Sequence, residues 1–188
     1  MNVRKPRYNE QKATQATCIL LELNGGEMSL LKLMKLIYNV EREAINRWMR
    51  PITFGNSCSM PHGQVISEAY DNAKLVNQAR DSFWTKHIRT FSNNKVRLIN
   101  NDCGIDKLSK AEIKLLQEMF EKYKNKTALQ MRNEHHDKDL FPEYSDPGNS
   151  SIMTTYEDIL IALGKTENQI EEFKKDLREL SILEGIKS

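Results

Sequence analysis

The sequence has few of the residues that build disulfide frameworks or zinc sites. Only three of its 188 residues are cysteine, and they lie far apart at Cys18, Cys58 and Cys103. Three scattered cysteines make neither a disulfide framework nor a CxxC metal pair, and they fit a reducing compartment. Long apolar runs and a secretory leader are also lacking, so we expect a cytoplasmic protein that does not enter a membrane.

Catalytic motifs are missing as well. The chain has no GxGxxG, GxxxxGK[ST], GxSxG or HExxH sequence. Adjacent His135 and His136 point in different directions from one helix end, and no third ligand stands at metal-binding spacing. Cys58 and His62 are four residues apart, but no third residue orients them as a nucleophile–base pair. We expect no catalytic residue, metal ion or cofactor, and the alternative is an enzyme of unrecognised type that uses these four side chains.

The charge is divided unevenly along the chain. Residues 1–100 carry 15 Lys and Arg against 8 Asp and Glu, a net charge of +7, whereas residues 101–188 carry 13 against 18, a net charge of −5. A basic half can bind nucleic acid, contact an acidic partner or attract the acidic half of its own chain. A nucleic-acid-binding regulator is therefore a second alternative, which the modest isoelectric point near 8.3 disfavours.

Apolar periodicity predicts helices in the first half of the chain. A helix is expected over 8–24, and a second, more apolar one follows Ser29 and ends at Arg50-Pro51. Its apolar arc is too wide for a surface helix, so we expect it to be the central helix of the core. Residues 52–60 are predicted to form an irregular hairpin, a second buried helix to begin near Val65, and residues 83–99 to form a β-hairpin.

Helix-capping patterns dominate the second half. Ser109 and Glu112 form a capping box for a helix that runs to about residue 123. Further helix starts are expected at 127–130, 154–157 and 166–169, with a polar loop over 135–151. The predicted fold is mainly α, a compact helical domain with one or two short β-hairpins inserted.

The segment 25–73 carries a more specific pattern. Its first part reads Gly-Gly-Glu-Met-Ser-Leu-Leu-Lys-Leu-Met-Lys-Leu-Ile-Tyr, and Arg-Pro-Ile-Thr follows at 50–53. Met60-Pro-His-Gly-Gln-Val then leads into Ser-Glu-Ala-Tyr-Asp at 67–71. This series resembles the SocA-like, or Panacea, antitoxin domain of bacterial and phage toxin–antitoxin systems. The similarity covers roughly residues 10–145, so we expect an antitoxin domain over 1–150 and a C-terminal helical extension over 151–188.

The resemblance implies a binding protein rather than an enzyme. It implies an antitoxin that neutralises a cognate toxin by direct contact, with the toxin encoded next to it and with delivery of the toxin to a protease as a further step. The oligomeric state stays open. Because the extension is acidic, we also expect a basic toxin to dock there, and deletion of 166–188 to weaken toxin binding.

Two sets of residues follow from the motifs. The candidates for partner binding are Lys35, Arg42, Trp48, Arg50, Thr53 and His62. The motif residues expected to serve the fold are Leu33, Leu36, Tyr38, Pro51, Met60, Gly63, Val65 and Tyr70. Lys35 and Arg42 are seven residues apart and are expected to share the polar edge of the central helix.

Overall fold

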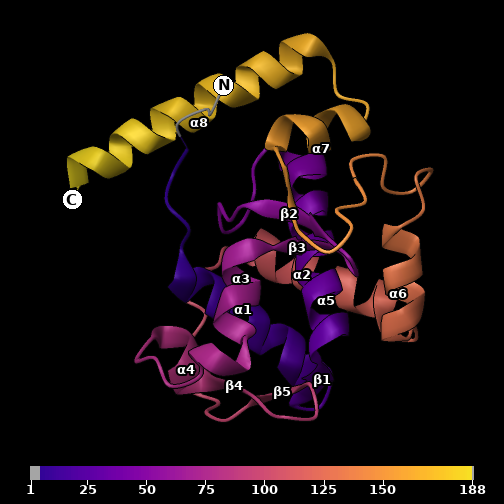
Figure 1. Ribbon diagram of the computed structural model, residues 1–188. Coiled ribbons are helices and arrows are strands. Elements are labelled where there is room, and N and C mark those ends of the chain that lie inside the picture. Colours follow the sequence, from indigo (N-terminus) through magenta and orange to yellow (C-terminus); the bar gives the residue numbers. More distant parts are fainter. Residues whose placement is uncertain (1–4, 188) are drawn as a thin grey trace.

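The computed structural model describes residues 5–187, which form eight α-helices, one 3₁₀ helix and six short strands (Figure 1). The elements in chain order are α1 (Glu10–Leu23), β1 (Glu27–Ser29), α2 (Leu30–Trp48), β2 (Ser57–Met60), β3 (Gly63–Ile66), α3 (Ser67–Ala73), η1 (Leu75–Asn77), α4 (Phe83–His87), β4 (Ile88–Thr90), β5 (Lys95–Leu98), α5 (Lys110–Tyr123), α6 (Ala128–His135), β6 (Ile152–Thr154), α7 (Tyr156–Ala162) and α8 (Glu167–Lys187). Helices account for 53% of the chain, which confirms the mainly α prediction.

The capping residues begin the helices where the sequence predicts. The Ser29 side chain accepts a hydrogen bond from the backbone amide of Lys32 at the start of α2. Ser109 and Glu112 form the expected capping box of α5, and Thr127 begins α6 in the same way. Each cap satisfies amides that a helix start leaves without partners, so these boundaries are set by local sequence.

Helix α2 lies at the centre of the molecule and has core residues on both sides. Leu33 and Leu36 belong to a cluster that also contains Leu20 of α1 and Leu115 of α5. On its other side, Tyr38 belongs to a second cluster, which includes side chains of α7 and α8. The prediction of a central helix is therefore confirmed.

Two three-stranded antiparallel sheets lie on different parts of this helical body. The first has the strand order β1-β5-β4 and lies beside α4 at the bottom of Figure 1. It contains the hairpin predicted over 83–99, although residues 83–87 form α4 instead of strand. The second has the order β3-β2-β6, and its β2–β3 hairpin turns at Pro61-His62.

The helix predicted to begin near Val65 is wrong at its start. Val65 lies in β3 opposite Cys58 of β2, and α3 begins only at Ser67. All four residues of β3 are buried, because the strand is paired with β2 on one side and contacts α2 and α6. Val65 and Ile66 are adjacent apolar residues, and periodicity cannot separate so short an apolar run in a buried strand from the start of a buried helix.

The segment 151–187 is integrated into the fold. Strand β6 pairs with β2, with Met153 opposite Cys58. Ile159 of α7 and Phe173 of α8 are buried in the second cluster. Helix α8 crosses the top of the molecule, and its C-terminal end projects past the body (Figure 1). Among the described helices, none combines the length and apolar composition that crossing a bilayer requires.

Candidate functional site

The predicted partner-binding residues lie in different environments. Trp48 and Arg50 are exposed at the C-terminal end of α2, and Trp48 is 38% exposed. His62 is exposed at the tip of the β2–β3 hairpin. Lys35 and Thr53 are buried in the core, so in this structure their side chains cannot contact a partner at the surface. The expectation that Lys35 lies on the polar edge of α2 is wrong for the same reason.

Lys35 forms the centre of a buried polar cluster between α2, β3 and α6. Its ammonium group, with the residue only 1% exposed, donates a hydrogen bond of 2.7 Å to the backbone carbonyl of Gln64. Burial lowers the pKa of Lys35 to about 7, since the charged form loses its hydration. His135 lies close by, and its Nε2 is 2.9 Å from Oδ1 of Asn39. Burial and the cations Lys35 and Arg42 hold the pKa of His135 well below its usual range.

The close approach of β3 to α2 and α6 depends on Gly63. Its φ of +88° lies in the left-handed region, which favours glycine. A Cβ atom at this position would lie 2.6 Å from Cβ of His135 and 3.1 Å from Nζ of Lys35. The glycine of the Met-x-x-Gly motif therefore permits the packing that buries the polar cluster.

A second group links α2 to the loop after α6. Arg42 Nε is 2.6 Å from the Glu143 carboxylate, whose side chain is fully buried, and the Tyr38 hydroxyl donates to the same oxygen at 2.8 Å. The Arg42 guanidinium also lies 4.9 Å from the centre of the Phe141 ring. Arg42 is therefore occupied by contacts within its own chain, and it holds the segment after α6 against the central helix.

The Arg-Pro-Ile-Thr motif is fixed by a buried carboxylate that sequence reasoning missed. Glu41 accepts hydrogen bonds from the backbone amides of Ile52 and Thr53 at 2.7 and 2.9 Å, and from the Thr53 hydroxyl at 2.5 Å. Burial raises the pKa of Glu41, and these three donors offset part of that rise. A signal was present, because Glu41 stands four residues after Ile37 and four before Ile45, on the apolar side of α2.

The motif residues expected to serve the fold are mostly buried. The buried ones are Leu33, Leu36, Tyr38, Pro51, Gly63 and Val65. Met60 and Tyr70 are half-buried and pack against the first core cluster. These positions support the architecture around α2 and β3.

The hairpin predicted over 83–99 carries four cations of the basic first half, Lys86, Arg89, Lys95 and Arg97, and fewer of them are free to bind nucleic acid than the sequence indicates. Lys95 and Arg97 both pair with Glu27 of β1. Lys86 lies 3.1 Å from Asp81, which leaves Arg89 as the remaining cation of the four. Internal pairing reduces the positive charge that this hairpin offers to phosphates.

The candidate reagents of the enzyme alternative are mostly held in structural contacts. Cys58 is half-buried in β2, and burial raises the pKa of its thiol, which disfavours the nucleophilic thiolate. His136 stacks on Tyr144 with ring centres 4.7 Å apart. Within residues 5–187, no group of three or more His, Cys, Asp or Glu side chains is arranged to hold a metal ion.

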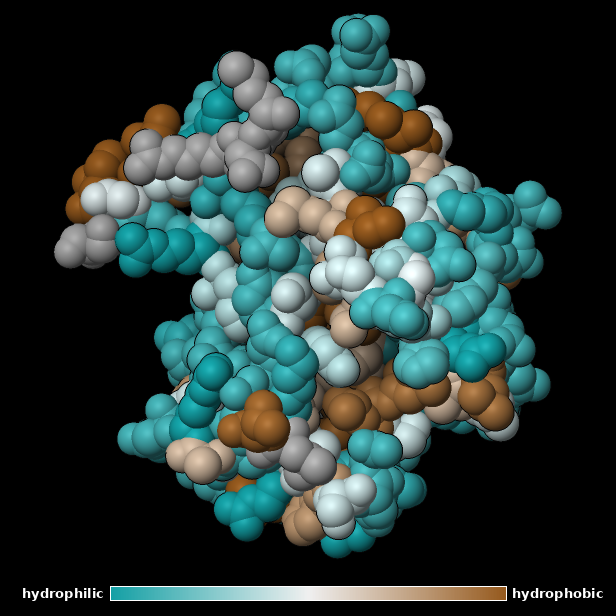
Figure 2. Space-filling model, in the orientation of Figure 1, coloured by the Kyte–Doolittle hydropathy of each residue, from teal (hydrophilic) through white to brown (hydrophobic). Residues whose placement is uncertain are grey.

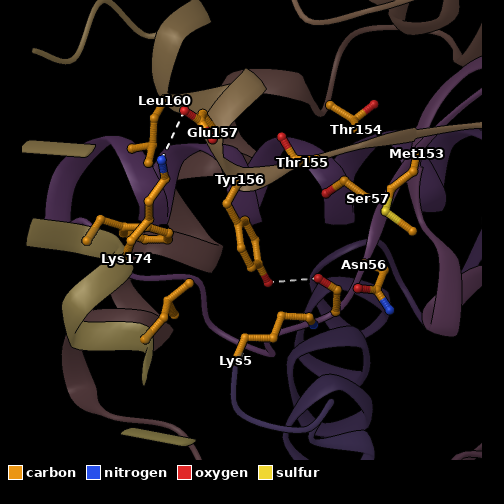
Figure 3. A pocket seen from close by; sticks show the side chains of 13 residues that line it. Lys5, Asn56, Ser57, Met153, Thr154, Thr155, Tyr156, Glu157, Leu160 and Lys174 are labelled. Carbon is orange, nitrogen blue, oxygen red and sulfur yellow. Dashed lines mark hydrogen bonds and ion pairs between the residues drawn. The ribbon is translucent and has the colours of Figure 1, made fainter. Parts of the chain in front are cut away.

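A recess lies beneath α8 (Figure 3). It has a volume of about 430 Å³ and is formed by β6, α7, α8, the residues before and at the start of β2, and Lys5. The Tyr156 hydroxyl donates to the Gly55 carbonyl at 2.8 Å across one side of it. Sequence reasoning missed this pocket, because it assembles residues from distant segments.

One further surface feature lies at the projecting end of α8. Ile182, Leu183 and Ile186 are all more than half exposed there. Figure 2 shows them as a brown patch at the upper left, on a surface that is otherwise mostly hydrophilic.

Comparison with known proteins identifies the family. The model of the SocA-like antitoxin family, Panacea domain, matches residues 33–140, which is more than half of the chain. Neither the curated proteins nor the solved structures contain a match. The matched segment runs from the first turn of α2 to the loop after α6, and so includes the buried Lys35 cluster and the Glu41–Thr53 contact. The family supports an antitoxin role in a toxin–antitoxin system and suggests a non-enzymatic one. The chain belongs to the SocA-like antitoxin family with a Panacea domain.

Proposed function

We propose that this protein neutralises a cognate toxin by binding it directly. The observation that carries the proposal is the family match over residues 33–140. The geometry supports it, because the motif residues in that segment mostly pack in or against the core, and of the candidate reagents His135 and His136 are held in structural contacts.

The proposal includes where the toxin comes from and where the two proteins meet. The toxin is encoded next to this chain, and the complex forms in the cytoplasm of a bacterium or of a phage-infected cell. Delivery of the bound toxin to a protease is a further step of the same proposal. We also keep the division into an antitoxin domain over 1–150 and a helical extension over 151–188, with the extension contributing to the partner surface.

Fewer residues are proposed for partner contact than the motifs alone indicate. Trp48, Arg50 and His62 remain candidates, since all three are exposed. Arg42 is a weaker candidate because it is paired with Glu143. Tryptophan and arginine are frequent in the energetic centres of protein interfaces, which favours the pair at the end of α2.

A growth assay tests this function. The neighbouring gene is expressed alone and together with this chain in the same host. We expect growth arrest in the first case and normal growth in the second. A neighbour that is harmless when expressed alone, or an arrest that this chain does not relieve, would reject the proposal.

A further inference from the structure

The pocket beneath α8 has walls that suit an apolar group. Its apolar wall is formed by Met153, Leu160 and the ring of Tyr156, which are labelled in Figure 3, and by Phe173 and Leu177. Its volume of about 430 Å³ falls within the range of roughly 300–1,000 Å³ that is typical of ligand pockets. Met153 is 62% exposed, so an incoming group can reach this side chain from the surface.

The two lysines that line the pocket already have partners. Lys174 lies 3.0 Å from Glu157 and 2.9 Å from Glu171. Lys5 donates to the carbonyl of Phe54. Because both lysines already have partners within the chain, an anionic ligand group would have to compete with contacts that are already formed. The surface that remains free for binding is the apolar wall.

The segment that forms the α7 and α8 walls of the pocket is acidic. Residues 156–174 contain five carboxylates and two lysines, which gives a net charge of −3. Glu157, which lines the pocket, is exposed, and so are Asp158, Glu167, Glu171 and Glu172, whereas Lys165 is half-buried and donates to the carbonyl of Asn46. Surfaces of one charge sign attract partners of the other sign and speed their association, so the exposed surface of this segment favours a basic partner.

The pocket also lies mainly outside the segment that defines the family. Nine of its thirteen lining residues come after residue 140, where the family match ends. The shared scaffold therefore carries a recess that is shaped by the chain's own C-terminal segment. Such a position allows partner specificity to differ without changes to the buried clusters of the scaffold.

We propose that the pocket beneath α8 receives one apolar side chain of a positively charged protein surface. This inference rests on the proposed function, in which that surface belongs to the toxin. A side chain buried in a well-packed pocket at the centre of an interface supplies much of its binding energy, while surrounding charges guide the encounter.

Single substitutions test the pocket more sharply than removal of α8. Deletion of 166–188 would expose the second core cluster, since Ile170, Phe173 and Leu177 are buried in it. Met153→Arg instead puts a bulky cation at the mouth of the pocket. Leu129→Arg on α6 is the matched control, because Leu129 is 61% exposed and does not line the pocket.

The experiment uses the purified neighbouring protein, once the growth assay has shown that wild type relieves its arrest. Titration calorimetry measures its affinity for wild type and for both variants. We expect Met153→Arg to weaken binding at least tenfold and Leu129→Arg to change it less than twofold. Unchanged affinity of Met153→Arg, or an equal loss in both variants, would overturn the pocket assignment and leave the antitoxin function standing.

The acidic surface of α7 and α8 has its own pair of variants. Glu172→Lys reverses one exposed charge on α8, and Glu22→Lys makes the same change on α1, far from the pocket. We expect Glu172→Lys to slow association several-fold at low salt and to flatten its dependence on ionic strength, with wild-type behaviour for Glu22→Lys. Faster association of Glu172→Lys would mean an acidic partner and would reject the charge assignment.

Discussion

The buried Lys35 gives the folded chain a dependence on pH that a surface lysine would not produce. The unfolded chain keeps the Lys35 proton up to its ordinary pKa of 10.5, whereas the folded chain releases it above about 7. Between these values the unfolded chain binds more protons, so the free energy of unfolding rises with pH. One pKa unit corresponds to about 1.4 kcal/mol, and the folded chain has already lost about half of the Lys35 proton at pH 7. The Lys35 contribution therefore grows by about 2 kcal/mol between pH 7 and pH 9.

Urea unfolding at several pH values between 7 and 9, followed by the fluorescence of buried Trp84, measures this contribution. Lys35→Met removes the titrating group, and we expect it to remove about 2 kcal/mol of the pH-dependent rise seen in wild type. Lys110→Met, at an exposed position on α5, is the control and should retain the wild-type rise. Parallel pH profiles for wild type and Lys35→Met would refute the reasoning.

Three further substitutions test the other buried contacts through the midpoint of urea unfolding. Arg42→Met leaves the carboxylate of Glu143 buried without its cation, so we expect a loss of about 3–5 kcal/mol, and a loss below about 1 kcal/mol would contradict the pairing. Thr53→Val removes a hydroxyl that donates to Glu41 and should cost about 1.5–3 kcal/mol, unless that contact contributes nothing. Gly63→Ala combines a left-handed backbone with a steric overlap and should cost at least about 2 kcal/mol, whereas wild-type stability would mean that β3 can move away.

The parts of the fold that were predictable from sequence depend on neighbouring residues. Ser29, Ser109 and Thr127 satisfy backbone amides within three positions of themselves, so their helix starts can be seen in the sequence. The start of α3 could not be predicted in this way. Val65 was apolar in the expected register, but its conformation depends on pairing with Cys58 and on packing against α2 and α6.

In the candidate site, too, the contacts between residues far apart in the sequence could not be predicted. Gly63 was expected to serve the fold, whereas Thr53 was expected at the partner surface and is buried. The contact that explains Thr53 is with Glu41, twelve residues away on α2, and no local pattern indicated it. Lys35 was expected at the surface, because a lysine is almost never fully buried, and only the assembled fold shows its carbonyl partner on β3. The pocket beneath α8 needs α7, α8 and the start of β2 together, so no local pattern predicts it.

The most direct test of the central claim is a size-exclusion measurement on the purified chain mixed with the purified product of the neighbouring gene. We expect the two proteins to elute together as one complex, and the toxic activity to be absent from that fraction. Relief of growth arrest without any complex between the two proteins would contradict neutralisation by direct binding.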